Sequence, residues 1–198
     1  RLSLALCDEN WVVSTRILKK RNKQTINKNK VKLIPNSPNI KRSYPSSKYN
    51  GNQNLLIISH LTKSIDFLPI IKSLRELRKK HKKIKLVIIG NGPEKNNLKK
   101  KVSKLKLDNY VKFLGYKSHE EIFKLMNNSF IGFAVYTKEN SWNYYGDSMK
   151  VREYAACSLP IIINTVPSTS DDVRSHRAGL VLDEINIEEI TNFIEKCI

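Results

Sequence analysis

Short apolar runs alternate with longer polar segments along most of the chain. The clearest runs are LLIIS, KLVIIG, YVKFLG, FIGFAVY, PIIIN and GLVLD, at residues 55–59, 85–90, 110–115, 130–136, 160–164 and 179–183. The segments between them predict helices over about 65–81, 94–105, 119–126 and 170–174, within 144–162, and from about 187 onward. Strands that are apolar throughout, joined by crossover helices, indicate a parallel sheet covered on both faces. We therefore expect an α/β fold with a doubly wound, Rossmann-like sheet.

A different pattern precedes this series. WVVST at 11–15 and VKLIP at 31–35 predict two short strands separated by a basic helix or loop. The segment 37–53, SPNIKRSYPSSKYNGNQ, is rich in Pro, Ser and Asn, which is typical of a linker. We therefore divide the chain into an amino-terminal part (1–36), a linker (37–53) and a main domain (54–198).

The charge is strongly positive, with 36 Lys and Arg against 18 Asp and Glu in 198 residues, a formal net charge of +18. Such a field attracts nucleic acid, anionic lipid headgroups and phosphorylated substrates. In 74–85 and 94–106, however, the lysines alternate with leucines at helical spacing, which is typical of solvated helix faces. A role at a membrane surface is the second interpretation. Nucleic-acid binding comes last, because no helix-turn-helix, zinc-finger or aromatic ribonucleoprotein motif accompanies the charge.

The cysteines and the chain start bear on location. Cys7, Cys157 and Cys197 are odd in number and lack metal-ligand spacing, so we expect no disulfide framework, no metal site and a reducing, cytoplasmic setting. No apolar run approaches the roughly 20 residues that span a bilayer, and the first residues lack the pattern of a secretion signal. Because the chain has no initiator Met, we expect it to start partway through a longer protein.

Ligands of doubly wound sheets bind beyond the carboxyl ends of the strands. We expect one crevice to collect the residues at those ends, which are Ser59, His60, Gly90, Asn91, Gly92, Gly115, Tyr116, Tyr136 and the stretch 146–150. The two glycines of GNGP allow a tight turn after a strand, and the following proline suits a first helical turn. That motif alone is a weak signal, because such glycines are often structural.

The stretch YYGDSMKVREYAACSLPII at 144–162 adds charge to this crevice. Asp147 or Ser148 is expected to cap a helix, leaving the first amides, at Ser148, Met149 and Lys150, as an anion site. Lys150 and Glu153 share one helix face and, read alone, form a simple ion pair worth a few tenths of a kcal/mol. Their neighbourhood favours a second interpretation, in which the ammonium faces a diphosphate and the carboxylate accepts two ribose hydroxyls.

Four blocks together carry a family resemblance: VIIGNGPEKNNL, VKFLGYKSHEEIFKLM, GDSMKVREYAACSLPII and AGLVLD. In order and spacing, they resemble the carboxy-terminal domain of family 4 glycosyltransferases, which have the two-domain GT-B fold. The match covers residues 54–198. ENWVVST and VKLIPNSPN resemble the end of that family's amino-terminal domain, with Ser37 where Gly is usual. The resemblance implies transfer of a sugar from a nucleotide-diphosphate donor, with retention of configuration and without a metal or other cofactor.

The resemblance also implies roles for individual residues. Glu153 would hold the ribose, the amides at Ser148 and Met149 the diphosphate, and Lys150 would add positive charge. Gly115 and Tyr116 would lie by the base, with Gly90, Asn91 and Gly92 bordering the crevice. His60 and Lys63 stand where the family commonly has Arg and Lys. Tyr145 replaces the first of the family's two glutamates, with Asp147 nearby. The catalytic candidates are therefore Lys150, Glu153, His60 and Lys63.

Several functions remain after this reading. The first is a partial glycosyltransferase, of hexosyl or N-acetylhexosaminyl type, that builds a surface polysaccharide or glycolipid. Its partners would be a nucleotide sugar, a glycan or lipid-linked acceptor and an anionic membrane surface. The alternatives are a nucleotide-sugar-binding module that is not catalytic by itself and an epimerase of the same fold. The epimerase is less favoured because the Lys-x-x-Glu-Tyr helix resembles the transferases more. A nucleic-acid binder is the least favoured.

Overall fold

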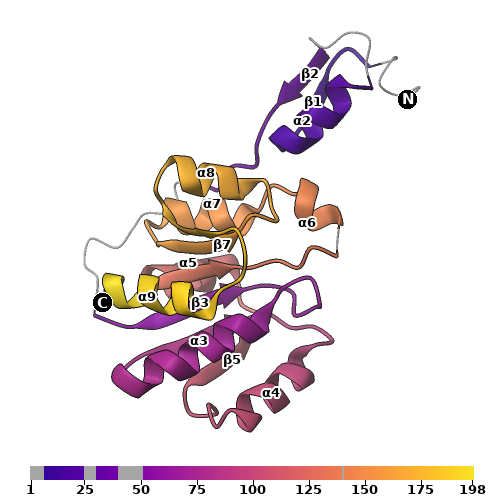
Figure 1. Ribbon diagram of the computed structural model, residues 1–198. Helices are drawn as coiled ribbons and strands as arrows, with labels where there is room; N and C mark the ends of the chain where they lie inside the picture. The colour runs from indigo at the N-terminus through magenta and orange to yellow at the C-terminus, as the bar shows by residue number, and fades with distance from the viewer. Residues whose placement is uncertain (1–6, 25–29, 40–50, 140) are drawn as a thin grey trace.

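The computed structural model describes residues 7–24, 30–39, 51–139 and 141–198 (Figure 1). In these residues the main domain is built on a parallel sheet with strand order β5-β4-β3-β6-β7-β8. The strands are β3 (Asn54–Ile58), β4 (Lys85–Ile89), β5 (Val111–Gly115), β6 (Ile131–Ala134), β7 (Ile161–Asn164) and β8 (Gly179–Leu182). The helices are α3 (Phe67–Lys80), α4 (Lys95–Lys104), α5 (His119–Asn127), α6 (Ser141–Tyr145), α7 (Met149–Ala156), α8 (Thr169–Ser175) and α9 (Ile187–Cys197). The doubly wound sheet expected from the sequence is confirmed.

Both faces of the sheet are buried because side chains of a strand alternate between them. In β3, Leu55 and Ile57 pack into one apolar cluster with α3, α4 and α9. Leu56 and Ile58 pack into a second cluster with α5, α7 and α8. Each face of the sheet is therefore covered by helices, which explains why the strands are apolar along their whole length.

The order of the strands fixes where a ligand binds. From β3 the chain adds β4 and β5 on one side, then returns to place β6, β7 and β8 on the other side. The direction of winding reverses between β3 and β6. In open parallel sheets the crevice lies at this reversal, outside the carboxyl ends of the strands.

A separate βαβ unit precedes the main domain and lies beside α6, α7 and α8 (Figure 1). It consists of β1 (Asn10–Val12), α2 (Thr15–Asn22) and β2 (Val31–Leu33), with the two strands parallel. The predicted strand at 11–15 is too long, because Ser14 caps α2 by accepting a hydrogen bond from the Ile17 N–H at 3.2 Å. Most of the predicted linker, residues 40–50, lies outside the described residues.

The end of β6 shows why strand ends differ from the prediction. The predicted strand ran to Tyr136, but β6 ends at Ala134. Beyond it, Asn164 of β7 takes over the backbone of Tyr136 through two hydrogen bonds, one from the Tyr136 N–H at 3.1 Å and one to its carbonyl at 2.7 Å. The side chain of Asn164, not the backbone of a neighbouring strand, thus forms these two hydrogen bonds with Tyr136. The short helix α6, which the sequence did not predict, begins at Ser141.

Among the described residues, no helix is both long enough and apolar enough to cross a membrane.

Tyr154 joins the sheet to α7 and gives a first testable prediction. Its side chain is fully buried, and its hydroxyl accepts a hydrogen bond from the Ile58 N–H at 3.2 Å. Because Tyr154→Phe removes this buried hydrogen bond, we expect the free energy of unfolding to fall by about 0.5–1.5 kcal/mol. Urea unfolding measures this, with Tyr116→Phe as control, since Tyr116 is 81% exposed. Equal stability of the two variants would contradict the prediction.

Candidate functional site

Three loops meet at the carboxyl ends of β3, β4 and β5. The Gly90 N–H donates to the Gly115 carbonyl at 2.7 Å. A Cβ on Gly90 would lie 1.9 Å from the Ser59 carbonyl oxygen, and one on Gly92 would lie 2.3 Å from the Leu61 carbonyl oxygen. Gly90 also has φ of +123°, a left-handed conformation that disfavours other residues. The two glycines are thus required for these backbones to approach, and the loops form one continuous edge at the carboxyl ends of these strands, where a ligand is expected.

Four predicted residues of these loops are exposed to solvent. His60, Lys63 and Asn91 are exposed, and Tyr116 projects into solvent after β5. Lys63 is connected to the segment that follows β6, because its carbonyl accepts a hydrogen bond from the Thr137 hydroxyl at 3.1 Å. Ser59 is different, since it is buried and its hydroxyl donates to the His60 carbonyl at 2.9 Å.

Tyr136 and Ser148 connect the end of β6 to the start of α7. Their hydroxyls lie 2.8 Å apart, and burial raises the pKa of Tyr136. Because the Ser148 hydroxyl is held by Tyr136, it does not cap α7, although Ser148 is the N-cap residue. Ser148 is thus the N-cap residue, as expected, but neither Ser148 nor Asp147 makes the expected side-chain capping bond. The first amides of α7 receive no side-chain cap, and they form a group of N–H donors at the helix start.

The residue before Ser148, Asp147, also holds the start of α7 in place. Its buried carboxylate accepts hydrogen bonds from Arg152 Nε at 2.9 Å and Nη2 at 2.6 Å, and from the Asn36 N–H at 2.6 Å. The hydrogen bond to Asp147 raises the pKa of Arg152. Arg152 also reaches Asp172 of α8 at 3.1 Å. The Asp147 carboxylate is thus occupied by protein partners, and contact of this residue with a ligand stays a prediction.

Lys150 and Glu153 both lie half-buried on α7. Within the described part of the chain they form no ion pair with each other or with another residue. Burial lowers the pKa of Lys150, an effect that the charge of Glu153 opposes. Burial raises the pKa of Glu153, opposed by the charges of His119 and Lys150. Two partly desolvated ionisable groups without protein partners are suited to an anion and to hydroxyl donors, respectively.

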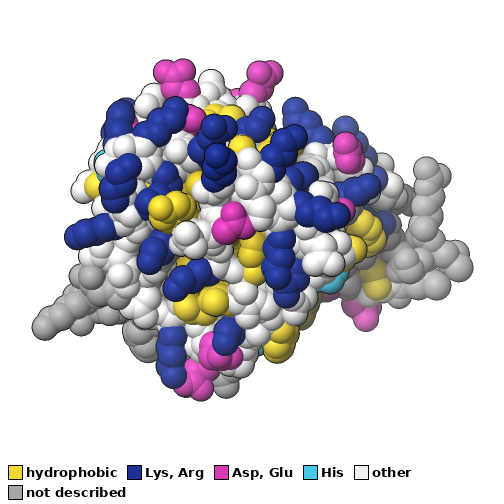
Figure 2. All heavy atoms as spheres, turned by 90° about the horizontal axis from the view of Figure 1, so that it is seen from below, with side chains coloured by type: hydrophobic (Ala, Val, Ile, Leu, Met, Phe, Trp, Pro, Cys, Tyr) yellow, Lys and Arg dark blue, Asp and Glu magenta, His cyan; other side chains and the backbone are white. Residues whose placement is uncertain are grey.

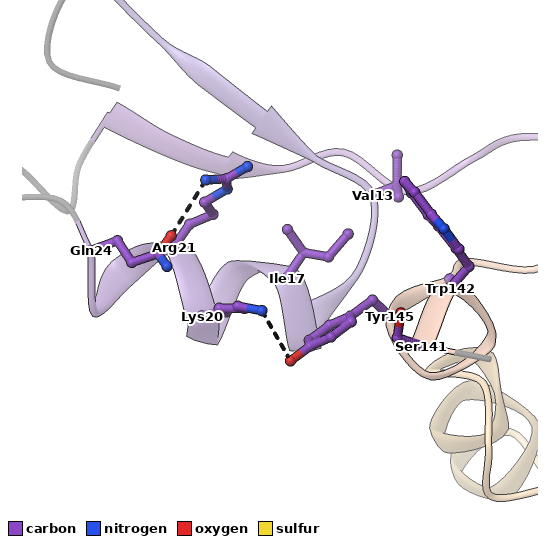
Figure 3. Close-up of a pocket in the computed structure, with 9 residues that line it drawn as sticks. Val13, Ile17, Lys20, Arg21, Gln24, Ser141, Trp142 and Tyr145 are labelled. Atoms are coloured by element: carbon purple, nitrogen blue, oxygen red, sulfur yellow. Dashed lines mark hydrogen bonds between the residues drawn. The ribbon is translucent and has the colours of Figure 1, made fainter. Parts of the chain in front are cut away.

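Tyr145 points toward the amino-terminal unit (Figure 3). Lys20 Nζ lies 4.6 Å from the centre of the Tyr145 ring and 3.4 Å from its hydroxyl. The two residues border a cavity of about 480 Å³ between α2 and α6. The cavity is lined by Val13, Ile17, Lys20, Arg21, Gln24, Ser141, Trp142, Tyr145 and Gly146. The sequence did not indicate this cavity, because more than a hundred positions separate its two walls.

Comparison with sequence families gives one match that covers most of the chain. Residues 36–198 match the family described as Glycosyl transferases group 1. Among curated proteins, an uncharacterised glycosyltransferase of Methanocaldococcus jannaschii is 26% identical over 172 residues, which is 82% of this chain and 39% of the relative. The chain therefore spans well under half of that protein.

Comparison with solved structures gives similar folds. Anabaena HepE in complex with UDP has a TM-score of 0.82 at 17% identity, covering 99% of this chain and 55% of HepE. TarM of S. aureus has a TM-score of 0.78 at 16% identity, covering 96% of this chain and 36% of TarM. The pneumococcal O-GlcNAc transferase GtfA, in complex with UDP and GlcNAc, has a TM-score of 0.73 at 18% identity, covering 96% of this chain and 37% of GtfA. At these identities the similarity establishes the fold.

Proposed function

This chain belongs to the group 1 glycosyltransferases, whose fold is GT-B, and we propose that its crevice binds a nucleoside-diphosphate sugar. In the whole protein, the sugar is transferred with retention to a glycan or lipid-linked acceptor, as in family 4. The observation that carries this proposal is the pair Lys150 and Glu153, half-buried beside an uncapped helix start and with no hydrogen bond or ion pair to any of the described residues. The UDP complexes of HepE and GtfA support the choice of a nucleotide ligand.

Each part of the donor has a matching part of the crevice. The diphosphate lies at the first amides of α7, where the helix dipole and the Lys150 ammonium favour negative charge. Glu153, one turn later, accepts hydrogen bonds from the ribose hydroxyls. The base lies by Gly115 and the exposed Tyr116, and the loop 90–92 borders the pocket.

These groups act on the leaving diphosphate. When the bond from the anomeric carbon to the diphosphate oxygen breaks, negative charge develops on that oxygen, and Lys150 and the α7 amides stabilise it. The oxygen of the acceptor hydroxyl forms the new bond to the anomeric carbon, and its proton passes to the departing phosphate. The crevice aligns the two reactants, with no protein nucleophile. His60 and Lys63, exposed at the neighbouring loop, add donors for the phosphates.

The βαβ unit fits the end of an acceptor-side domain, with the boundaries given by the sequence. On its outer face Trp11 is 67% exposed and Ile34 is 42% exposed, which is the pattern of a sheet that further chain covers. The cavity between α2 and α6 is lined in part by Gly146, which directly precedes Asp147 and the start of α7. Its Trp142 offers an aromatic face for a sugar, and Lys20 and Arg21 suit an acidic acceptor group.

An anionic membrane is the proposed partner of the basic face. Residues 72–112, which include most of α3 and all of α4, contain fifteen Lys and Arg and three acidic residues. Figure 2 shows the molecule of Figure 1 as seen from below. On this face Lys and Arg far outnumber Asp and Glu. At a surface of anionic lipid, each such residue contributes about 1 kcal/mol. This attraction would hold the enzyme near a lipid-linked acceptor.

Titration calorimetry of the chain with UDP, GDP and ADP, and with a short DNA duplex at two salt concentrations, tests the donor site. We expect saturable binding of one nucleoside diphosphate. Binding of DNA with steep salt dependence, together with no binding of any nucleotide, would overturn the proposal, because the charge would then mark a nucleic-acid surface.

The raised pKa of Glu153 gives a pH-dependent prediction. Only the ionised carboxylate accepts from both ribose hydroxyls, and a raised pKa means that protonation begins at a higher pH than for an ordinary glutamate. As the pH falls from about 7.5 to about 5, we expect the affinity advantage of wild type over Glu153→Gln to shrink. Protonation of the ligand phosphates affects both proteins alike. The ratio of their two affinities, measured by calorimetry, therefore isolates the effect of Glu153. A constant ratio across this range would contradict the prediction.

A further inference from the structure

Four consecutive carbonyl oxygens before α7, those of residues 144–147, each accept a hydrogen bond from a distant side chain. The donors, in chain order of the acceptors, are Arg16 to Tyr144 at 2.9 Å, Ser14 to Tyr145 at 2.7 Å, Ser168 to Gly146 at 2.8 Å and Asn36 to Asp147 at 2.9 Å. Three of these donors belong to the βαβ unit or to the segment that leaves it. The amino-terminal unit therefore holds the backbone that leads into the helix start.

Holding a carbonyl also fixes the next amide. A trans peptide is planar, and its C=O and N–H point in opposite directions. The described residues contain no cis peptide. When Asn36 Nδ2 holds the Asp147 carbonyl, it therefore directs the N–H of Ser148 away from the βαβ unit. That N–H has no protein acceptor among the described residues, and it is one of the amides at the start of α7.

Asn36 holds the same peptide by a second contact. Its own backbone N–H donates to Asp147 Oδ2 at 2.6 Å, while Arg152 occupies the carboxylate from α7. Asp147 is thus fixed at its carboxylate and at its carbonyl. The peptide between Asp147 and Ser148 has little freedom to rotate while Asn36 is in place.

We propose that Asn36 is a positioning residue for the diphosphate, acting through the Asp147 carbonyl to aim the Ser148 amide at a phosphate oxygen. The inference rests on the proposed donor site. It couples the two parts of the chain, because the diphosphate site is complete only while the segment after β2 is docked on Asp147. A binding group in the main domain thereby depends on a residue contributed from outside it.

The test compares Asn36→Ala with Lys32→Ala. Lys32 belongs to the same βαβ unit, but its ammonium pairs with Glu9 inside that unit and, among the described residues, contacts no carbonyl of 144–147. Calorimetry measures affinity for whichever of UDP, GDP and ADP binds wild type, and NMR titration measures affinity for the matching nucleoside. We expect Asn36→Ala to weaken the diphosphate about tenfold and to leave the nucleoside unchanged. Lys32→Ala should change neither.

The outcomes separate this inference from the proposed function. Equal weakening of diphosphate and nucleoside, or no weakening of either, overturns the role of Asn36 while the donor site stands. Failure of wild type to bind any of the three diphosphates overturns the donor site and the inference with it. If Asn36→Ala does not fold, Asn36→Leu keeps the number and branching of the side-chain heavy atoms, lacks the donor and is expected to give the same tenfold loss.

Discussion

Replacing Glu153 by alanine should weaken binding of the nucleoside diphosphate about 100-fold. In the proposed site the Glu153 carboxylate accepts two hydrogen bonds from the ribose, and hydrogen bonds to charged groups each contribute about 1.5–3 kcal/mol. A net loss of about 2.7 kcal/mol corresponds to a hundredfold change in Kd. Calorimetric titration of both proteins with the nucleotide that binds measures this loss.

The ribose assignment has its own controls. Glu188→Ala removes an exposed glutamate of α9, far along the chain from the crevice, and should leave the affinity unchanged. The 2′-deoxy nucleotide should bind wild type more weakly, but Glu153→Ala should not distinguish it from the ribonucleotide. Such non-additivity identifies a direct contact. If the deoxy effect has the same size in both proteins, Glu153 does not hold the ribose.

Gly90→Ala should lower the free energy of unfolding by about 3 kcal/mol or more. The added Cβ would lie 1.9 Å from the Ser59 carbonyl oxygen, and φ of +123° strains any residue with a side chain. The loops after β3 and β4 must separate to relieve this clash, so nucleotide binding should be lost as well. Urea unfolding measures the stability.

Gly51→Ala separates the two causes. Gly51 also has a positive φ, of +72°, but a Cβ there would meet no atom within 4 Å. This variant should cost only the strain of the left-handed conformation, about 1 kcal/mol. If Gly90→Ala costs no more than Gly51→Ala, the close approach of the two loops is not a feature of the folded protein.

The fold could be predicted because its signals are local. Buried strands such as Leu55–Ile58 are apolar at every position, and the helices between them carry apolar residues at the helical period. The short α6 has no buried residue and no such period, so it was missed. The predicted strand at 11–15 extended too far, because Ser14 caps the helix α2 instead of continuing the strand.

The site could be predicted only in part. The rule for strand ends correctly brought Gly90 to Gly115 and Tyr136 to Ser148, because topology alone places those loops together. The sequence could not show that the Asp147 carboxylate is occupied by protein partners, since one of them, Asn36, lies 111 positions away. The spacing of residues along the chain also does not show in which direction a loop side chain points.

The most direct measurement records amide chemical shifts of the nitrogen-15-labelled chain during titration with the nucleoside diphosphate that binds. Binding in the crevice predicts the largest shifts at Gly115 and at Ser148, Met149 and Lys150. Those residues come from β5 and α7, on different sides of the switch between β3 and β6. Largest shifts on the basic helices α3 and α4, with these four amides unmoved, would contradict a donor site in this crevice.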